Sequence, residues 1–198
     1  MASTLDIPAA LAETVRLLSA TGTLPPTGWG RAAIRQDSST LITSDLQGLG
    51  PLGDGDPNLS ARGTDLATTV LRVRTDQGAA LLTHAPYSTA WGLARRPLPV
   101  RFSPLIRFTS DEAIPVVHAA DETTVLNAFR TNPSLKALLI PGQGILVLGQ
   151  DLIATARALI GIEEAARLAW QAESIGGQQA FPHDAGERVA RGIATDAA

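Results

Sequence analysis

The chain has 198 residues, of which 44% are hydrophobic, and this is enough for one domain with a single core. Its formal net charge is −3 and its Lys and Arg residues are scattered along the chain, so we expect no nucleic-acid partner. The lack of cysteine excludes disulfides and thiolate metal sites, and no apolar run is long enough to cross a bilayer. We therefore expect a cytoplasmic protein with no membrane partner and no cleaved leader.

The first part of the chain predicts a helix, a hairpin and a loop. Apolar residues recur at helical spacing over residues 7–20. Residues 29–35 and 39–44 have the composition of two short strands around a polar turn, which predicts a hairpin. Residues 47–62 are rich in Gly and Pro and lack periodicity, so we predict a mobile loop that is able to cover a site.

The segment over residues 64–74 fits two kinds of secondary structure. Its sequence ATTVLRVR has high strand propensity, whereas Leu66, Val70 and Val73 recur at helical spacing. Thr64 is a good N-cap residue, so we predict a helix that begins there.

The middle of the chain alternates between apolar runs and helical patterns. The predicted elements are a strand over 79–83, a helix over 87–95, an extended segment over 100–108, a strand over 114–118 and a helix over 122–130. Asp121 is placed to cap the last of these helices.

The most periodic stretch of the chain runs from residue 137 to residue 172. Two apolar runs, 137–140 and 145–148, flank a Gly-rich turn, which predicts a hairpin of buried strands. A long amphipathic helix follows, and Asp151 is placed to cap it. Gln143 lies in the turn, either as an ordinary polar turn residue or as a side chain that meets a ligand.

The C-terminal part of the chain differs in composition from the rest. Beyond Ser174 the sequence becomes polar and rich in Gly, with one short helical pattern over residues 185–193. We expect a single domain over residues 1–174 and a tail over residues 175–198 that is flexible or packs on a neighbouring subunit.

Several of these segments, in this order, resemble the class II aldolase and adducin-head family. The matching segments, each with the family pattern that it resembles, are Trp29–Gly30 with Ile34–Arg35 (G-N-x-S-x-R), Leu41–Thr43 (I-T-P-S-G), Thr83–Ala94 (H-T-H-S-P-Y-A-T-A-x-A) and Ala137–Gly149 (A-L-L-x-N-H-G-x-x-x-x-G). The resemblance extends from residue 7 to residue 173. It implies an α/β fold, a three-layer α/β/α sandwich with a central, mostly antiparallel sheet, and a homo-oligomer with its site at the subunit interface.

Enzymes of this family hold a divalent cation with three histidines, usually beside a glutamate. The resemblance places Leu82, His84 and Gln143 at the three histidine positions, in that order, and puts the glutamate position at or near Gly63. One imidazole and one amide are a poor donor set for zinc. We therefore expect no catalytic metal, and we expect no other cofactor.

A second register of the same motif is also compatible with the sequence. It places His84 at the first histidine position and Pro86 at the second, with Asp65 near the acidic position. This register also leaves the metal site incomplete.

The anion pocket of the family is changed as well, because hydroxyl-bearing residues are replaced by arginines. The residues that we expect to bind an anionic group are Arg31, Arg35, Thr43 and Arg62. A planar guanidinium suits a carboxylate or a phosphate. The alternative is that these arginines are solvated or pair with Asp54, Asp56 or Asp65.

We therefore favour a metal-independent enzyme that acts on a small anionic substrate by general acid/base chemistry. His84 is the expected acid or base, Gln143 orients the substrate or donates to an oxyanion, and Tyr87 or Asp65 assists. A decarboxylation, a dehydration and a Pictet–Spengler-type condensation and cyclisation all fit this group, and they leave the reaction open. The alternatives are a non-catalytic binding or structural protein, as the adducin head is, and a conventional metal aldolase with an unusual ligand set.

Overall fold

A five-stranded sheet forms the centre of the protein. The computed structural model describes residues 6–61, 63–106, 108–109 and 112–177. The strand order is β2-β1-β3-β7-β6, and every neighbouring pair is antiparallel. The strands are β1 (Gly30–Arg35), β2 (Leu41–Asp45), β3 (Ala79–Thr83), β6 (Ala137–Ile140) and β7 (Gly144–Gly149). A separate two-stranded ladder joins β4 (Leu98–Pro99) to β5 (Ala113–Ile114).

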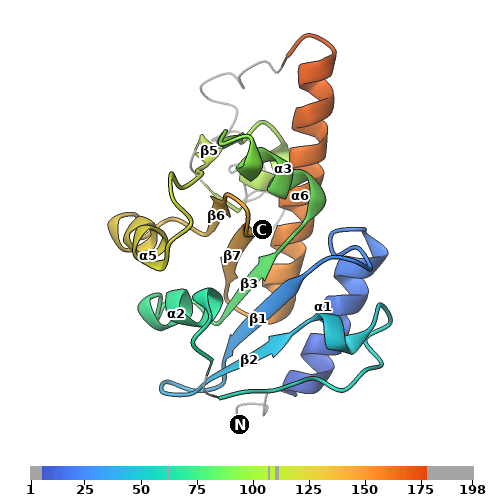
Figure 1. The fold of residues 1–198 in the computed structure, drawn as a ribbon, viewed down its shortest axis with the longest axis vertical. Coiled ribbons are helices and arrows are strands. Elements are labelled where there is room, and N and C mark those ends of the chain that lie inside the picture. Colours follow the sequence, from blue (N-terminus) through green and yellow to red (C-terminus); the bar gives the residue numbers. More distant parts are fainter. Residues whose placement is uncertain (1–5, 62, 107, 110–111, 178–198) are drawn as a thin grey trace, which may run out of the picture.

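Helices cover both faces of the sheet and complete three layers (Figure 1). One face carries the long α6 together with α1 and α3, and the other carries α2 and α5. The helices are α1 (Ile7–Ala20), α2 (Leu66–Val73), α3 (Pro86–Leu93), α4 (Ser103–Ile106), α5 (Glu122–Thr131) and α6 (Leu152–Ser174), with the short 3-10 helix η1 (Gln47–Leu49). The expected α/β/α sandwich with a mostly antiparallel sheet is thereby confirmed.

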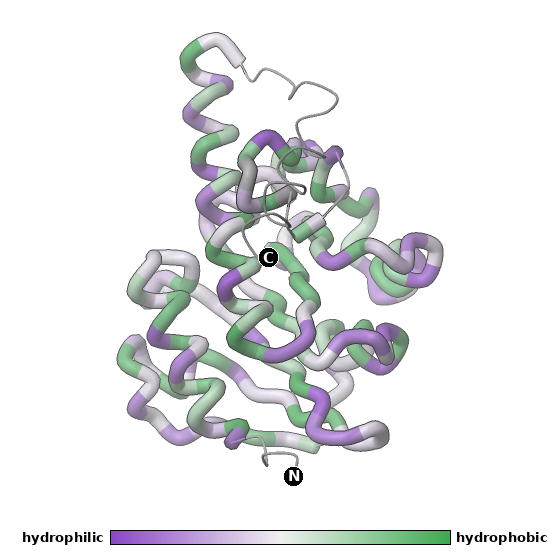
Figure 2. Tube along the Cα trace, turned by 180° about the vertical axis from the view of Figure 1, so that it is seen from behind, coloured by the Kyte–Doolittle hydropathy of each residue, from purple (hydrophilic) through white to green (hydrophobic). Residues whose placement is uncertain are grey.

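Each side of the sheet has its own hydrophobic core. In β3, Ala79 and Leu81 pack under α1 and α6, while Ala80 and Leu82 pack under α2 and α5. Successive side chains of a strand point to opposite faces, so a strand that is covered on both sides is apolar at every position. This explains why β3 and β7 consist almost entirely of apolar residues, and Figure 2 shows hydrophobic (green) stretches through the middle of the fold.

Aspartates set the starts of most helices. Asp121 and Asp151 accept hydrogen bonds from the backbone N–H groups three residues later, as predicted for α5 and α6. The predicted helix over residues 64–74 is also present as α2, but its N-cap is Asp65 rather than Thr64. The Asp65 carboxylate lies three residues before Thr68 and accepts a hydrogen bond from its backbone N–H, which makes Asp65 the cap.

Two predicted segments differ from the structure. The extended segment over residues 100–108 is wrong, because it contains the helix α4, in whose first turn Pro104 is readily accommodated. The strand over residues 114–118 is shorter than predicted, since Pro115 has no N–H to continue the ladder; Val116 instead bridges Leu139. The predicted tail helix over residues 185–193 lies outside the described residues.

Candidate functional site

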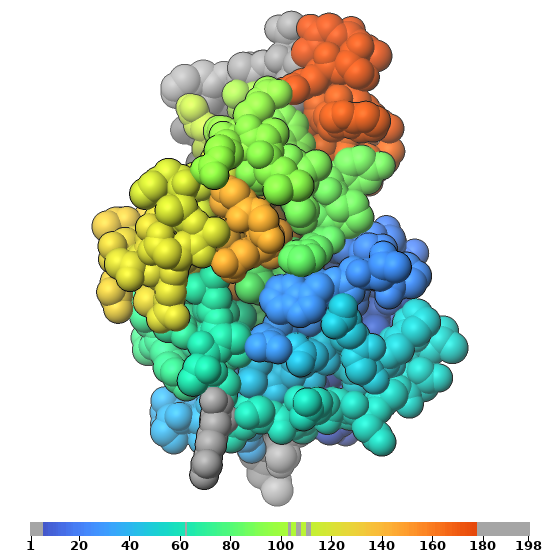
Figure 3. All heavy atoms as spheres, viewed as in Figure 1, coloured from blue at the N-terminus to red at the C-terminus, as the bar shows by residue number. Residues whose placement is uncertain are grey.

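The antiparallel order of the sheet brings distant segments to one of its ends. β3 ends at Thr83, β2 ends at Asp45, and β1 and β7 begin at Gly30 and Gly144 at this same end. Figure 3 shows the start of β1 (blue), the start of α3 (green) and the β6–β7 turn (orange) meeting on one face. The residues that follow or precede these strand ends therefore lie at one end of the sheet and form one candidate site.

His84 is the first residue after β3, and its side chain is exposed to solvent. Its backbone N–H donates to the carbonyl of Trp29 at 2.9 Å, and the centroid of its ring lies 5.2 Å from that of Trp29. Gly144 lies against the other side, with a φ of +97°. A Cβ at this position would lie 2.0 Å from the Thr83 carbonyl oxygen and 3.2 Å from His84 Cδ2, so only glycine leaves the histidine in place.

Gln143 precedes Gly144, so its backbone adjoins the His84 site. Its Nε2 donates to the carbonyl oxygen of Ala120 at 2.9 Å, and its backbone N–H donates to Ile140 at 3.0 Å. The half-buried amide thus joins the β6–β7 turn to the segment before α5. One end of the amide is already engaged, and the role of Gln143 as an orienting residue stays a prediction.

Arg31 lies on β1 next to Trp29 and opens onto a recess of about 370 Å³. Its Nε and Nη2 both donate to Asp45 Oδ1, at 2.8 and 2.5 Å, and its Nη1 lies 4.0 Å from Asp65 Oδ2. The guanidinium carbon is 5.9 Å from the centre of a Trp29 ring, so Trp29 contacts both Arg31 and His84. The recess is lined by Arg31, Thr43, Ser44, Asp45, Asn58, Ser60, Gly63, Thr64 and Asp65.

Asp65 joins the N-terminus of α2 to β2. Its carboxylate accepts hydrogen bonds from Thr43 Oγ1 at 3.1 Å, from the backbone N–H of Thr68 at 3.0 Å and from Thr68 Oγ1 at 2.8 Å. Only 10% of the side chain is exposed. The structure therefore places Asp65 beside Arg31 as a helix cap.

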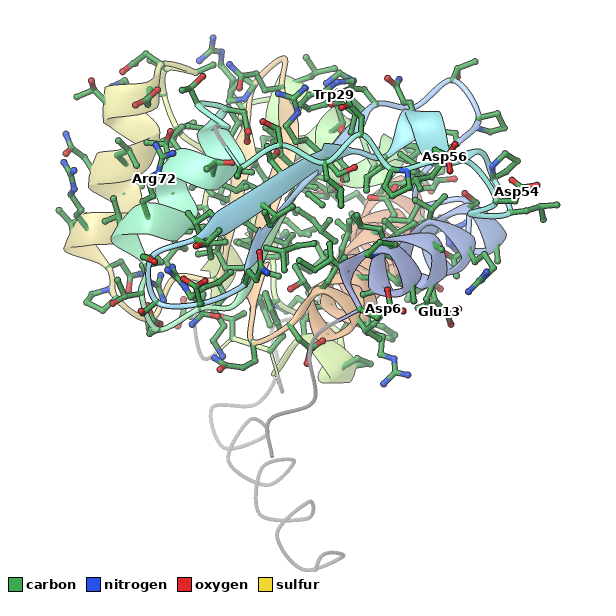
Figure 4. The ribbon with its side chains drawn as sticks, turned by 90° about the horizontal axis from the view of Figure 1, so that it is seen from below. Asp6, Glu13, Trp29, Asp54, Asp56 and Arg72 are labelled. Carbon is green, nitrogen blue, oxygen red and sulfur yellow. The ribbon has the colours of Figure 1, made fainter. Side chains whose placement is uncertain are left out.

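The described part of the predicted loop, residues 47–61, contributes one wall of the recess. Ser60 and Thr43 exchange backbone hydrogen bonds at 2.9 Å, which attaches the loop to β2. Asn58 and Ser60 then face the recess. Asp54 and Asp56, two of the three partners that the sequence offered for the arginines, lie beside η1 (Figure 4). The third, Asp65, forms an ion pair with Arg31 at 4.0 Å, and Asp45 is the closer partner at 2.5 Å.

Two predicted site residues lie elsewhere, and a third cannot be placed. Arg35 is four residues beyond Arg31 on β1, about 13 Å along the strand. It donates to the carbonyls of Leu71 and Gln77, so it holds the end of α2. Tyr87 lines a groove between α3 and α6, with its ring centroid 6.0 Å from that of Trp170. Arg62 lies outside the described residues.

The helix that follows His84 is held by a carboxylate from α6. Ala85, the N-cap residue of α3, has no side chain able to cap it. Glu163 accepts hydrogen bonds from the backbone N–H of Tyr87 and from both the N–H and the hydroxyl of Ser88. Burial raises the pKa of Glu163, and the hydrogen bonds from Ser88 and Tyr87 oppose this effect.

The residues present do not fit the metal centre implied by the family. Leu82 pairs with Arg31 and Leu146 across the sheet and is 3% exposed in the core, so it contributes an apolar side chain where a ligand is needed. His84 supplies one imidazole and Gln143 one amide. Among the described residues no three His, Cys, Asp or Glu side chains gather into a group able to hold a metal ion.

Three residues of this region are not among the site residues expected from the sequence. Trp29 was noted only as part of a motif, although an aromatic residue at the exposed start of a strand next to an arginine is a usable signal. Asp45 was missed because the predicted strand ended at Ser44, one residue short of the partner of Arg31. Glu163 lies within the long helix α6, and no local signal in the sequence shows that it caps α3.

Comparison with known proteins supports the same family. Residues 14–170 match the model of the class II aldolase and adducin N-terminal domain. A 5-methylthioribulose-1-phosphate/5-deoxyribulose-1-phosphate aldolase from Rhodospirillum rubrum is 28% identical over 169 residues, which are 84% of this chain and 73% of that protein.

Solved structures show the same fold. An L-fuculose 1-phosphate aldolase superposes with a TM-score of 0.74 at 16% identity, covering 96% of this chain and 97% of that one. The L-fuculose 1-phosphate aldolase from Glaciozyma antarctica PI12 gives a TM-score of 0.73 at 14% identity, covering 96% of this chain and 83% of that one. In the part of the chain that the structure describes, no helix is long and apolar enough to cross a lipid bilayer. The chain belongs to the class II aldolase and adducin N-terminal domain family.

Proposed function

We propose that the protein is an enzyme that acts on a small substrate with an anionic group, by general acid/base chemistry at His84 and without a resident metal ion. The observation that carries this proposal is the contact of Trp29 with both His84 and Arg31. It sets an exposed imidazole and a guanidinium beside the same indole. An imidazole can accept and return a proton near neutral pH, and a guanidinium binds carboxylates and phosphates.

The division of roles follows from these two groups. Arg31 binds the anionic group of the substrate, and His84 moves a proton at an atom of the substrate that lies near Trp29. In a dehydration, for example, His84 takes a proton from carbon and then protonates the departing hydroxyl, which leaves as water. A decarboxylation and a Pictet–Spengler-type condensation and cyclisation need the same kind of proton transfer.

We also propose that the protein forms a homo-oligomer whose subunit interface adjoins the site. Large hydrophobic side chains remain exposed on the single chain, among them Leu93 and Trp170 of the neighbouring helices α3 and α6. Such exposure is typical of a surface that a second subunit covers. Sedimentation equilibrium of the wild-type chain tests this, and a monomer at micromolar concentration would contradict it.

The enzymatic proposal is tested with a panel of phosphorylated ketoses, 2-oxo acids and amino acids, incubated with the protein in the presence of EDTA and analysed by mass spectrometry. The panel includes 5-methylthioribulose 1-phosphate and 5-deoxyribulose 1-phosphate, because the aldolase of R. rubrum is named for them. We expect turnover that survives EDTA and falls by about 100-fold or more in His84→Gln. His118→Gln is the control, since His118 is also exposed but lies on another segment.

Three outcomes would refute the proposal. A stoichiometric metal ion whose removal abolishes turnover would return the protein to the metal aldolases. Unchanged turnover in His84→Gln would assign the chemistry to another group. Tight binding of a substrate with no conversion would show a binding protein.

A further inference from the structure

The recess at Arg31 carries more negative than positive charge on its described residues, which disfavours the binding of a phosphate. Among the residues that the structure describes, one guanidinium and two carboxylates, those of Asp45 and Asp65, line it, and these three groups together carry a formal charge of −1. Both carboxylates lie within 4.0 Å of the guanidinium. A phosphate ester with two negative charges would therefore meet two carboxylates for a single guanidinium, which repels it.

The same groups suit a ligand that carries both charges. Arg31 uses Nε and Nη2 for Asp45, whereas its Nη1 makes no hydrogen bond to any residue that the structure describes. This side of the guanidinium is able to donate to a carboxylate.

Acceptors for a cation stand next to that donor. Both bonds from Arg31 go to Oδ1 of Asp45, and Oδ2 has no hydrogen-bond partner among the described residues. The Asp45 side chain is 39% exposed, and the side-chain amide of Asn58 also lines the recess without a described partner. An ammonium group donates in three directions and needs several oxygen acceptors of this kind.

We propose that this recess binds the amino and carboxylate groups of an α-amino acid, with the carboxylate on Arg31 and the ammonium on Asp45. The inference rests on the proposed function, since it names the class of the anionic substrate. The hydroxyls of Thr43 and Ser44 donate to Asp65 and to the Asp45 carbonyl, so they leave oxygen lone pairs, rather than protons, to face the ligand. That arrangement again favours an ammonium over a phosphate.

The test measures binding, so it needs no turnover. The twenty L-amino acids and inorganic phosphate are titrated separately into ¹⁵N-labelled protein while the signals of the Arg31 Nε–H and the Trp29 indole N–H are followed. For the amino acid that binds best, the corresponding amine without the carboxylate and the acid without the amino group are titrated as well. We expect the amino acid to bind at least about tenfold more tightly than either fragment and than phosphate. Phosphate binding more tightly than every amino acid would overturn the proposal, and this comparison requires no variant.

Replacing the Asp45 carboxylate by an amide should shift the preference of the recess from an amino acid toward phosphate. Asp45→Asn removes the partner of the ammonium and makes the three-group sum neutral, so amino-acid affinity is expected to fall about tenfold while phosphate affinity rises. Asp37→Asn is the matched control, because it makes the same change of charge in the exposed turn of the same hairpin. Equal amino-acid affinities in the Asp45 and Asp37 variants, both with native-like spectra, would also overturn the proposal.

The binding result is separable from the catalytic one. The titrations are repeated in His84→Gln, which leaves the recess intact. Amino-acid binding without turnover in the wild type would contradict the proposed function and leave this inference standing. EDTA-resistant turnover of a substrate without an amino group would support the proposed function and contradict this inference.

Discussion

Replacing Glu163 by Gln tests a buried polar contact behind the candidate site. The carboxylate lies on α6, is 6% exposed, and accepts three hydrogen bonds from the first turn of α3. Pro86 occupies the first position of that turn and Ala85 has no capping side chain, so Glu163 is the cap of α3. Because His84 lies two residues before α3, the contact also fixes the chain at the site.

The cost of the substitution follows from the donors that lose their acceptor. A glutamine retains one oxygen and turns an NH₂ group toward the remaining N–H donors of Tyr87 and Ser88. A buried donor left unpaired costs about 1–3 kcal/mol, so we expect Glu163→Gln to lower the free energy of unfolding by about 2–3 kcal/mol. Glu163→Ala removes all three bonds and should cost about 3–5 kcal/mol.

Urea unfolding measured by tryptophan fluorescence is the assay, since Trp91 of α3 donates to the carbonyl of Ala166 on α6 and reports their separation. Glu164→Gln is the control on the same helix. It removes only the partially exposed ion pair with Arg167 and should change stability by less than about 0.5 kcal/mol. Equal stability of the two Gln variants would refute the capping role of Glu163.

The pH dependence provides a second measurement. Burial raises the pKa of Glu163 above its ordinary value of 4.5. As the pH rises from 4.5 to the folded-state pKa, the unfolded chain releases this proton and the folded chain keeps it, so wild-type stability falls. The Gln variant carries no such proton. The loss of unfolding free energy in Glu163→Gln, relative to the wild type, should therefore be largest below pH 4.5 and shrink as the pH rises. A loss that grows with pH would contradict burial as the dominant effect on the pKa.

Three further predictions concern the hairpin and the turn at the site. Gly144→Ala should destabilise the protein by about 2–4 kcal/mol in urea unfolding, because the new methyl group collides with the Thr83 carbonyl at a positive φ; an unchanged midpoint would contradict it. Arg35→Met should cost about 1–3 kcal/mol by the same assay, since buried carbonyls lose their donor, yet leave ligand binding at Arg31 unchanged; weakened binding would place Arg35 in the site after all. Hydrogen bonds from Ser39 and Thr40 lower the pKa of Asp37 from 3.8 to about 2, so its stabilisation is present above pH 3.8 and disappears as the pH falls toward 2. The melting temperature of Asp37→Asn should accordingly depend less on pH between 2 and 4 than that of the wild type, and parallel curves would refute the assignment.

The main elements of the fold were determined by local sequence. The helical spacing of apolar residues and the caps Asp121 and Asp151 predicted α5 and α6, and continuous apolar runs predicted the buried strands. Local patterns did not predict the shortest elements correctly. The helix α4 has a single turn and the strand β5 has two residues, which are too few for a periodicity to show.

The composition of the site was decided by tertiary structure. His84, Gln143 and Arg31 are candidates from the sequence because each lies in a motif, and the antiparallel order of the sheet brings their strand ends together. Tyr87 faces the groove between α3 and α6 because of the direction in which α3 leaves β3. The spacing of residues along the sequence does not reveal that direction.

The charged groups around Arg31 also show which features come from the sequence and which come from the tertiary structure. Sequence supplied an arginine and several aspartates within reach, and it left their pairing open. The register of β1 with β2 places Asp45, rather than Asp54 or Asp56, opposite Arg31, and the start of α2 brings Asp65 to its other side. Strand register is set by the packing of two hydrophobic faces, so the charge balance of the recess follows from the core and could not be read from the residues that line it.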